Sequence, residues 1–488
     1  MSNANVIFDE ALDSSAQLFM HPTYRYSKSF PMNTGQTVLI TPNSNMTVQF
    51  ELPTNNQVVN LSKSVLSFTA TYPIPAAVNR FNFIHAHPFQ NIESISLSTR
   101  QGIRLVDVVD VAHLSSMISS ICTPIETLSQ RYGNTAMTVA ASKLTPVHGL
   151  TPAWPGVNTA AGSARAFKSR SHATRISNKN GLIYAPISNA SVSENDVTGD
   201  TRAKTYPQEY VEFFEGLNNQ ITNITYKLAL SELFGTLLAV DKDIFFGQSL
   251  ILSITWAPTS RHGFYGVHTA WSDDTTMDTR GFEDTLPLAV TCSLVDLCVY
   301  NCLETNPDII NKIMNSPTDI IIPYMMTNLL STTGANTNML IKYNGLQGKT
   351  IARYYWGVFN TTLNPDFTLG LENSITEYYT TVDGIRETDF PLNFNTYDPI
   401  LFNEPKLEGS AHQTPAHYLR NFVHIADWTG IPPCRDPGTM LNGLALDRER
   451  QLHVNATLPT EPATASTQYM FVELRRRLTI ANGLINLE

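Results

Sequence analysis

Charged residues are scarce in this sequence. Asp, Glu, Lys and Arg make up 15% of its 488 residues, whereas an average globular protein has about 25%. Acidic residues outnumber basic ones by 42 to 32, which gives a formal net charge of −10. A protein that coats nucleic acid needs an excess of basic residues to neutralise the phosphates. The composition therefore argues against a chain that binds a nucleic-acid backbone directly.

Long apolar runs and an export signal are also missing. No stretch approaches the roughly 18 apolar residues of a membrane-spanning helix. The opening residues, MSNANVIFDEALDSS, contain neither the basic start nor the apolar core of a signal peptide. We therefore expect a soluble protein that is made in the cytosol.

Cysteine is rare and follows no metal-binding pattern. The chain has five cysteines and no Cys-x-x-Cys motif, and an odd number without an export signal predicts reduced thiols. The positions of Cys292, Cys298 and Cys302 differ by even numbers, so on a regular strand they would share one face. Metal ligands need to converge from loops, and we expect these three side chains to be small buried apolar groups.

The abundant residues favour strands. Thr, Asn, Ser and Pro fill the share that charged residues leave, and they favour strands, turns and loops over helices. In residues 61–73, Leu66, Phe68, Ala70 and Tyr72 alternate with Ser and Thr, as in a half-buried strand. With 42% hydrophobic residues the chain can bury large cores. The composition predicts a mostly β protein, and the length predicts two or three domains.

A six-residue pattern occurs twice. TRQGIR at 99–104 and TVDGIR at 381–386 share Thr-x-x-Gly-Ile-Arg, and each follows a strand-like run. Breaks of this kind predict hairpin turns, with Gly102 and Gly384 at the bends. The other strand-like segments occur in the same order in both halves, which predicts a duplicated β fold. They are 36–42, 45–53, 61–73, 223–235, 243–256 and 286–304 in the first half, and 318–326, 337–344, 349–360, 418–428, 444–459 and 468–483 in the second.

A short helix is predicted between the two halves. In TNPDIINKIMNSP (305–317), Asn306 has the position of an N-cap, Pro307 that of the first helical residue, and Pro317 ends the helix. We interpret this helix as a connector between two β domains. A second helix is predicted at 108–121 from its apolar spacing.

Two other segments lack a regular pattern. Residues 1–34 are predicted to be an arm that becomes ordered against a neighbouring subunit or an inner-shell component. Residues 145–208 are predicted to be a long surface insertion, because a loop of this length is uncommon unless it is functional or disordered. Its basic residues could touch nucleic acid, but we favour a solvated loop or a contact with an acidic neighbouring subunit. These residues are Arg165, Lys168, Arg170, Arg175 and Lys179, with Phe167 between them.

The order and pattern of these segments resemble the double-jelly-roll major capsid proteins of icosahedral double-stranded DNA viruses. The resemblance rests on VNLSKSVLSFTATYP (59–73) with NIESISLSTRQGIRL (91–105), which are similar to the early strands and hairpin of that family. It also rests on YKLALSELFGTLLAVDKDIFFGQSLILSITW (226–256), which is similar to the stretch that closes the first jelly roll. It covers nearly the whole chain, from about residue 35 to the end.

The resemblance implies an all-β fold of two consecutive eight-stranded jelly-roll β-sandwiches, a double jelly roll, joined by a short helical linker. The implied division is an arm at 1–34, a first jelly roll at 35–303 with a long insertion at about 122–220, the linker at 304–317, and a second jelly roll at 318–488. A jelly roll closes most of its own sheet edges, so it suits a rigid tile in a shell.

The function implied by the resemblance is structural. The family forms homotrimers whose six jelly rolls make pseudo-hexameric capsomers, and these capsomers tile an icosahedral shell. We accordingly expect a viral major capsid protein and not an enzyme, with no catalytic residue, no cofactor and no metal ion. The expected location is the virion, after synthesis in the host cell cytoplasm.

The partners implied by the resemblance are other capsid components. They are two further copies of the chain, neighbouring capsomers, and penton and minor capsid proteins. The arm is expected to reach an internal membrane or an inner-shell protein. No direct specific binding to nucleic acid is expected, because the net charge is negative.

A jelly-roll enzyme of the cupin type is the first alternative. His85, His87 and Glu93 are similar to the cupin metal motif, with Gly102 after them. The gap from His87 to Glu93 is longer than in that motif, and the chain has no matching later histidine motif.

A β-sandwich glycoside hydrolase or carbohydrate-binding protein is the second alternative. It would use a carboxylate pair such as Asp241 with Asp243, or Glu372 with Glu377, although spacing alone does not show that two carboxylates share a cleft.

Three consecutive arginines lie in the last predicted strand. Alternation places Arg475 and Arg477 on one face and Arg476 on the other. We expect them to form salt bridges between subunits or capsomers.

Overall fold

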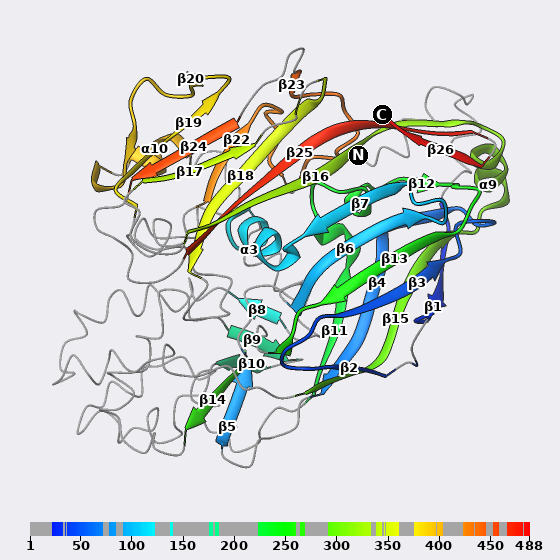
Figure 1. Cartoon of the computed structure of the whole chain (residues 1–488). Coiled ribbons are helices and arrows are strands. Elements are labelled where there is room, and N and C mark those ends of the chain that lie inside the picture. The colour runs from blue at the N-terminus through cyan, green and yellow to red at the C-terminus, as the bar shows by residue number, and fades with distance from the viewer. Residues whose placement is uncertain are drawn as a thin grey trace.

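The computed structural model of the chain contains two β-rich halves (Figure 1). The residues that it describes are 22–32, 35, 37–71, 78–83, 91–122, 137–139, 175–178, 181–184, 223–259, 264–268, 291–332, 338–343, 346, 348–360, 375–396, 398–403, 423–433, 435–445, 452–457, 466–481 and 483–488.

The first half contains two antiparallel sheets packed on each other (Figure 1). Their strands are β1 (Tyr24–Ser29), β2 (Val38–Ile40), β3 (Met46–Leu52), β4 (Val59–Thr71), β6 (Ile92–Thr99), β7 (Arg104–Val109), β11 (Asn223–Ala229), β12 (Asp243–Ile244), β13 (Leu250–Trp256) and β15 (Cys292–Glu304). The larger sheet has the order β1-β15-β4-β11, with β2 beside β15 and β12 beside β4. The smaller sheet has the order β3-β13-β6-β7.

Short elements lie between these strands. β5 (Val78–Phe83) pairs with β14 (Phe264–His268), and β8 (Met137–Val139), β9 (Arg175–Asn178) and β10 (Gly181–Tyr184) form a small sheet. The helix α3 (Val111–Cys122) follows β7, and two 3-10 turns, η7 (Leu230–Glu232) and η8 (Leu237–Ala239), follow β11. The helix predicted at 108–121 is thus present and begins three residues later. The insertion predicted at about 122–220 lies largely outside the described residues.

The second half repeats this arrangement. Its strands are β16 (Thr318–Thr332), β17 (Asn338–Tyr343), β18 (Thr350–Asn360), β19 (Glu377–Val382), β20 (Ile385–Arg386), β21 (Leu392–Asn393), β22 (Val423–Asp427), β23 (Leu444–Ala445), β24 (Leu452–Thr457), β25 (Ser466–Ala481) and β26 (Leu484–Leu487). One sheet has the order β16-β25-β18-β22, with β23 beside β18 and β26 beside β25. The other has the order β17-β24-β19-β20, with β21 beside β19. The 3-10 turn η11 (Phe394–Thr396) and the helix α10 (Asp398–Asn403) follow β21.

Eight strands of each half correspond one to one in chain order. β3, β4, β6, β7, β11, β12, β13 and β15 occupy the sheet positions of β17, β18, β19, β20, β22, β23, β24 and β25. β1 and β2 both pair with β15 along the edge that β16 occupies on β25. The predicted all-β fold of two consecutive sandwiches is confirmed, because both halves contain the same pairings in the same order.

The repeated hexapeptide marks the same hairpin in both halves. TRQGIR joins β6 to β7 and TVDGIR joins β19 to β20, and each hairpin lies at the free edge of the smaller sheet. At the second bend Asp383 and Gly384 both have positive φ values, 55° and 82°, as a two-residue type I′ turn requires. At the first bend Gly102 alone has a positive φ value, 90°, so the two turns differ in type although their positions agree.

The linker helix α9 (Pro307–Met314) begins as predicted from its sequence. The Asn306 side chain accepts a hydrogen bond from the Asp308 backbone N–H at 3.1 Å, which satisfies one of the free amides of the first turn. Ile309 is the buried residue of the helix.

The cores come from strict alternation in the central strands. In β13 every second residue from Leu250 to Trp256 is buried, and the residues between them are half-buried. Trp256 packs edge-on against Phe68 of β4, with ring centroids 4.7 Å apart. This pair joins the two sheets of the first sandwich, since β4 and β13 belong to different sheets.

The cysteines of β15 do not share one face. The strand contains a β-bulge between Val295 and Cys298, where Asp296 has a φ of 54°. A bulge inserts one residue and reverses the faces beyond it. Cys292 therefore lies in the core, whereas Cys298 and Cys302 are buried on the other side of the strand. The prediction of buried reduced thiols is confirmed for all three, and burial raises the pKa of Cys302 to about 11.

The predicted arm at 1–34 is wrong for its last third. Residues Tyr24–Ser29 form β1, which pairs with β15 of the same chain from Tyr24 opposite Glu304 to Ser29 opposite Val299. The sequence YRYSKS has little apolar periodicity because an edge strand with an exposed outer side does not need it.

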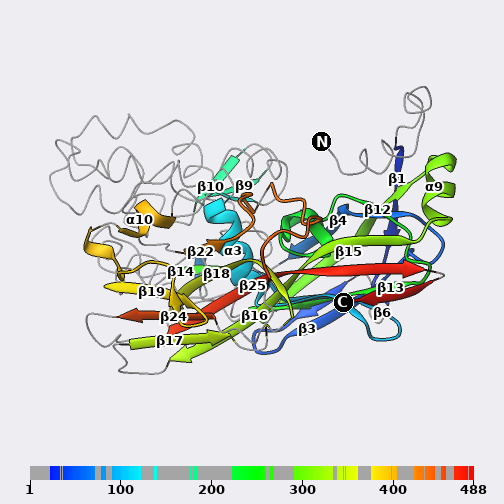
Figure 2. The same cartoon turned by 90° about the horizontal axis from the view of Figure 1, so that it is seen from above.

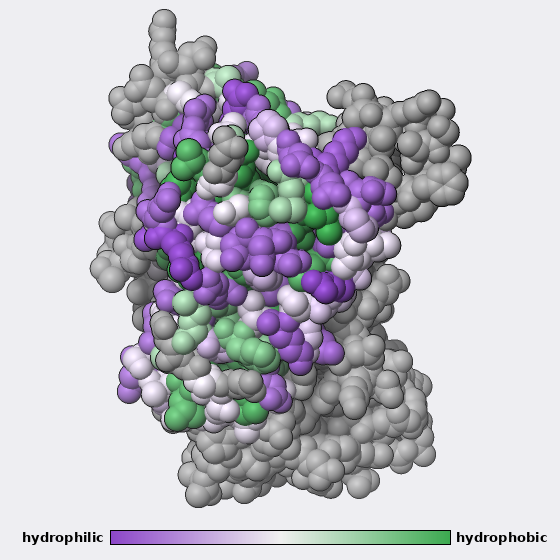
Figure 3. All heavy atoms as spheres, turned by 90° about the vertical axis from the view of Figure 1, so that its right-hand side faces the viewer, coloured by the Kyte–Doolittle hydropathy of each residue, from purple (hydrophilic) through white to green (hydrophobic). Residues whose placement is uncertain are grey.

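The two ends of the molecule expose different elements. β1 and α9 lie at one end and α10 at the other in both views (Figures 1 and 2), and β20 lies at the same end as α10 in Figure 1. On the face around β1 and α9, hydrophobic groups lie among hydrophilic ones (Figure 3). Among the described residues, no helix is long and apolar enough to span a membrane.

Candidate functional site at the junction of the two sandwiches

The two sandwiches meet along β7 and β16. These strands lie side by side, and the Thr327 hydroxyl of β16 donates a hydrogen bond to the Val109 carbonyl at 3.3 Å. Beyond β7, the His113 ring of α3 stacks on Tyr469 of β25 with centroids 3.9 Å apart. The hydrophobic core is continuous across this junction, so the two sandwiches pack as one body.

A glycine permits a close approach between the halves. Gly235, between η7 and η8, has a φ of 73°, and a Cβ there would lie 2.5 Å from the Met325 methyl and 3.1 Å from a Glu473 oxygen. A side chain at this position would therefore push the first sandwich away from β16 and β25.

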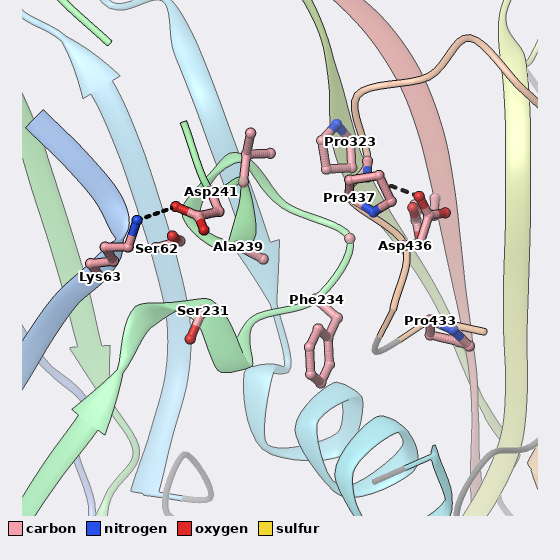
Figure 4. Close-up of a pocket in the computed structure, with 14 residues that line it drawn as sticks. Ser62, Lys63, Ser231, Phe234, Ala239, Asp241, Pro323, Pro433, Asp436 and Pro437 are labelled. Carbon is pink, nitrogen blue, oxygen red and sulfur yellow. Dashed lines mark hydrogen bonds and ion pairs between the residues drawn. The ribbon is translucent and has the colours of Figure 1, made fainter. Parts of the chain in front are cut away.

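A polar cavity of about 410 Å³ lies beside this contact (Figure 4). Lys63, Phe234 and Asp241 line it from the first sandwich, and Asp436 and Glu473 line it from the second. Figure 4 shows Lys63 and Asp241 on one wall and Asp436 on the opposite one. Each wall carries its own network of charged groups.

The second-sandwich wall is built on a buried arginine cluster (Arg353, Asp427, Asp436, Glu473, Arg475). Arg353 lies 2.5 Å from Asp436, 3.4 Å from Asp427 and 3.5 Å from Glu473. Arg475 pairs with Glu473 at 2.5 Å and also with Asp436. Burial alone would lower the pKa of Arg353, but the surrounding carboxylates raise it overall, so Arg353 stays charged.

The prediction that Arg475 forms salt bridges between subunits or capsomers is wrong. Arg475 and Arg477 do alternate with Arg476, but the loop that contains Asp436 covers Arg475, whose side chain has no exposed area. Its ion pairs are within the chain and not between subunits. Arg477 is exposed and pairs with Asp319 of β16 at 2.6 Å, and Arg476 lies over the Tyr324 ring.

The first-sandwich wall is built on a lysine cluster (Tyr24, Asn60, Lys63, Asp241, Asp243). Lys63 donates to Asp241 at 2.7 Å and to the Tyr24 hydroxyl at 3.2 Å. The Asn60 amide donates to both aspartates, at 2.9 and 3.0 Å, and the Tyr24 hydroxyl donates to Asp243 at 3.1 Å. This network ties β1 to β4, to β12 and to the residues just before β12.

The two aspartates of this cluster have different pKa values. Burial raises the pKa of Asp243, and the nearby negative charge of Glu304 adds to this effect. Burial acts in the same direction on Asp241, but hydrogen bonds from Lys63 and Asn60 outweigh it and hold its pKa below the usual value.

The carboxylate pair proposed for a hydrolase is thus brought together, at Asp241 and Asp243. Each of the two already accepts hydrogen bonds from two side chains of its own cluster. In this arrangement the two carboxylates connect neighbouring strands through hydrogen bonds and an ion pair, which is a structural role. Of the second pair, Glu377 lies in β19 and Glu372 lies outside the described residues.

The cupin-like residues are only partly described. Glu93 lies in β6, Gly102 lies in the β6–β7 turn, and His85 and His87 lie outside the described residues. Within the described part of the chain, no group of three or more His, Cys, Asp or Glu side chains is arranged to hold a metal ion.

One feature of the sequence indicates the buried ion pairs at this junction. Arg353 stands in TIARYYWGVFN, where its neighbours on both sides are apolar or aromatic. A charged residue inside a fully buried strand predicts a buried ion-pair partner. The partners themselves could not be named, because Asp436 and Glu473 are 83 and 120 positions away.

Comparison with known proteins shows the fold but no close relative. A scan against protein-family models finds no match, and a search of curated proteins finds no significant one. Solved structures match over nearly the whole chain. The Faustovirus major capsid protein has a TM-score of 0.50 and 10% identity, and the match covers 96% of this chain and 92% of that one. The PBCV-1 virus capsid has a TM-score of 0.50 and 8% identity, with 96% and 97% covered.

Proposed function

We propose that the protein is a viral major capsid protein. The observation that carries the proposal is the duplication: two sandwiches with the same strand pairings occur in one chain, and the whole chain has the fold of two viral capsid proteins. A duplicated rigid sandwich suits a tile, since three copies supply six similar sandwiches for a nearly hexagonal block. An enzyme needs no such duplication.

The proposed assembly is a homotrimer that forms pseudo-hexameric capsomers. The low share of charged residues supports it, because large permanent interfaces are poor in charge. Large exposed hydrophobic side chains on both halves also support it. The proposed division of each chain is a first jelly roll at 35–303, with an insertion at about 122–220, the linker at 304–317 and a second jelly roll at 318–488.

The finer partners are proposed from the same function. They are neighbouring capsomers, penton and minor capsid proteins, and an inner-shell protein or internal membrane contacted by the residues that precede β1. The proposed location is the virion, after synthesis in the host cell cytoplasm. Each copy carries a charge of −10, so we propose that contact with the genome is indirect.

The proposed function excludes catalysis. Asp241 and Asp243, the best candidates for a hydrolytic pair, are tied to Asn60, Lys63 and Tyr24. We therefore propose that the chain has no catalytic residue, cofactor or bound metal ion.

Native mass spectrometry of the purified protein at micromolar concentration tests the assembly. The expected species is a trimer, and electron microscopy of the same sample should show particles with a nearly hexagonal outline. A folded monomer, or a dimer as the final species, would remove the capsid proposal. One equivalent of tightly bound iron, manganese or zinc would instead revive the cupin alternative.

A further inference from the structure

The junction between the two sandwiches has two sides of different kinds. The first sandwich contributes β7 and the helix that follows it, α3. The second contributes the edge strand β16 and the start of β25, which receives the His113–Tyr469 stack. Within one chain this contact is made once, between the first sandwich and the second.

Because the fold is duplicated, each of the two contacting surfaces has an equivalent surface in the other sandwich. In the second sandwich, β20 corresponds to β7 and is followed by α10, as β7 is followed by α3. In the first sandwich, β1 and β2 together correspond to β16. In the described part of the chain, β1 and β20 are both terminal strands of their sheets, so the outer edge of each faces away from the sheet.

Both of these equivalent surfaces, the β20–α10 surface and the β1–β2 edge, expose large hydrophobic side chains. On the β20–α10 surface, Ile385 is 75% and Leu401 70% exposed, and Phe390 and Phe402 are 47% and 40% exposed. On the β1–β2 edge, Tyr26 and Leu39 are each 58% exposed, and Phe30 and Met32 are 47% and 45% exposed. Exposed side chains of this size gathered at two sites indicate protein–protein contacts.

The charges around the two surfaces are opposite in sign. Arg25 and Lys28 are exposed on β1, whereas Asp383, Glu387 and Asp389 are exposed around β20, with Arg386 as the single basic residue among them. Opposite charges at the rim favour encounter between the two surfaces and disfavour the pairing of either surface with itself.

The β20–α10 surface is held in a fixed shape. Glu387 accepts a hydrogen bond from the Tyr354 hydroxyl at 3.4 Å and lies 3.2 Å from Nε2 of His424. The rings of Phe390 and Phe402 pack edge-on with centroids 5.6 Å apart. A surface that is already ordered loses little conformational entropy when it binds.

We propose that the β20–α10 surface of one copy packs on the β1–β2 edge of the next copy, in the way that β7 and α3 pack on β16 within the chain. β1 and α10 lie at opposite ends of the molecule (Figures 1 and 2), and the two surfaces are different, so the contact is head to tail. Contacts of this kind close into a ring when the rotation allows it. In a ring of three copies, contacts between the two sandwiches of one chain would alternate with contacts between sandwiches of neighbouring chains. This inference rests on the proposed trimer and names the surfaces that build it.

Aspartate substitutions test the two surfaces. Leu401→Asp on the first surface, or Tyr26→Asp on the second, should raise the concentration at which the trimer dissociates by about 30-fold or more, as for a central interface residue. Leu484→Asp is the matched control, since Leu484 is 68% exposed on β26, a strand that pairs with β25 and belongs to neither surface. The control should assemble like the unmodified chain. Thermal unfolding midpoints of all three variants establish that each remains folded.

Mixing the two defective chains gives a result that only a head-to-tail contact produces. The Leu401→Asp chain keeps its β1–β2 edge and the Tyr26→Asp chain keeps its β20–α10 surface. Their mixture should therefore form a one-to-one dimer that neither chain forms alone. A chain with both substitutions should stay monomeric in either mixture.

The outcomes separate this inference from the proposed function. If the unmodified chain is a trimer and the substitutions do not weaken it, the surfaces are wrong and the capsid proposal stands. If the unmodified chain is a folded monomer, the capsid proposal itself fails. If Leu484→Asp weakens the trimer as much as the other two, the contact lies elsewhere.

Discussion

The Nη2 atom of Arg353 lies 2.5 Å from Oδ2 of Asp436, and neither side chain is more than 2% exposed. Arg353 comes from the middle of a strand and Asp436 from a loop that crosses the outer face of the same sheet. The pair therefore fastens this loop over the sheet, and Asp436 lines the cavity between the sandwiches.

Replacing Arg353 by methionine should destabilise the second sandwich strongly. The substitution keeps an apolar stem but leaves Asp427, Asp436 and Glu473 buried with Arg475 as their remaining arginine. The expected loss is about 3–5 kcal/mol, typical of a buried charge deprived of its partner. Urea unfolding followed by tryptophan fluorescence measures it.

Arg477→Met is the control for this loss. Its partner Asp319 is exposed, as is Arg477 itself, so the urea midpoint should hardly move. Equal shifts for the two variants would show that burial of the Arg353 cluster adds nothing.

The two aspartates of the lysine cluster should have opposite effects on the pH dependence of stability. The folded pKa of Asp241 is lowered, so its contribution is present above its unfolded pKa of about 4 and is lost as the pH falls through the folded value. The folded pKa of Asp243 is raised, so its contribution is present below about pH 4 and is lost as the pH rises through the folded value.

Thermal unfolding of Asp241→Asn and Asp243→Asn between about pH 3 and pH 7 tests these signs. Asp241→Asn should be less stable than the unmodified chain at pH 7, by about 0.5–1 kcal/mol because the ion pair is half-exposed, and the difference should shrink toward pH 3. The difference for Asp243→Asn should change in the other direction. Parallel curves for the two variants would contradict the assigned shifts.

Gly443→Ala should displace the loop that covers the arginine cluster. Gly443 has a φ of 137°, and a Cβ there would lie 2.3 Å from the Ile351 carbonyl oxygen, an atom fixed in β18. The expected loss of stability is about 2 kcal/mol or more. Gly430→Ala isolates the conformational part, because Gly430 also has a positive φ, 70°, but open space around it. That variant should lose only about 1 kcal/mol. A larger loss at Gly430 than at Gly443 would exclude the steric explanation.

The stacked pair His113 and Tyr469 should couple the two sandwiches energetically. The rings lie 3.9 Å apart with an interplanar angle of 20°, and aromatic pairs of this kind contribute about 0.5–1.5 kcal/mol beyond burial. A double-mutant cycle with His113→Leu and Tyr469→Leu measures the coupling. Additive losses would mean that the stack does not hold the sandwiches together.

Local patterns predicted the regular elements well. Alternation in Leu250–Trp256 identified a half-buried strand because each side chain depends only on which face it occupies. The α9 start followed from Asn306 and Pro307, since capping involves neighbours within one turn. The repeated Thr-x-x-Gly-Ile-Arg located equivalent hairpins because the turn needs glycine at a positive φ.

The junction and its charges could not be predicted in the same way. The carboxylate partners of Arg353 and Lys63 lie between 74 and 178 positions away along the chain, and no local period encodes them. The bulge at Asp296 reversed the expected faces of Cys298 and Cys302 for a related reason. One residue in an unusual conformation reverses the face that each later side chain of the strand occupies.

The position of β15 and β25 in their sheets determines how the chain folds. Each comes last among the long strands of its half, yet each lies between strands from the beginning of that half. The backbone N–H of Thr23 meets the Glu304 side chain across 281 positions. Contacts so distant in sequence make folding slow. During synthesis β4 and β18 keep an open edge until their last partner leaves the ribosome, and such an edge invites pairing with another chain. Each half should therefore close in one late cooperative step, so the yield of correctly folded chains depends on keeping nascent copies apart until β15 and β25 have been made.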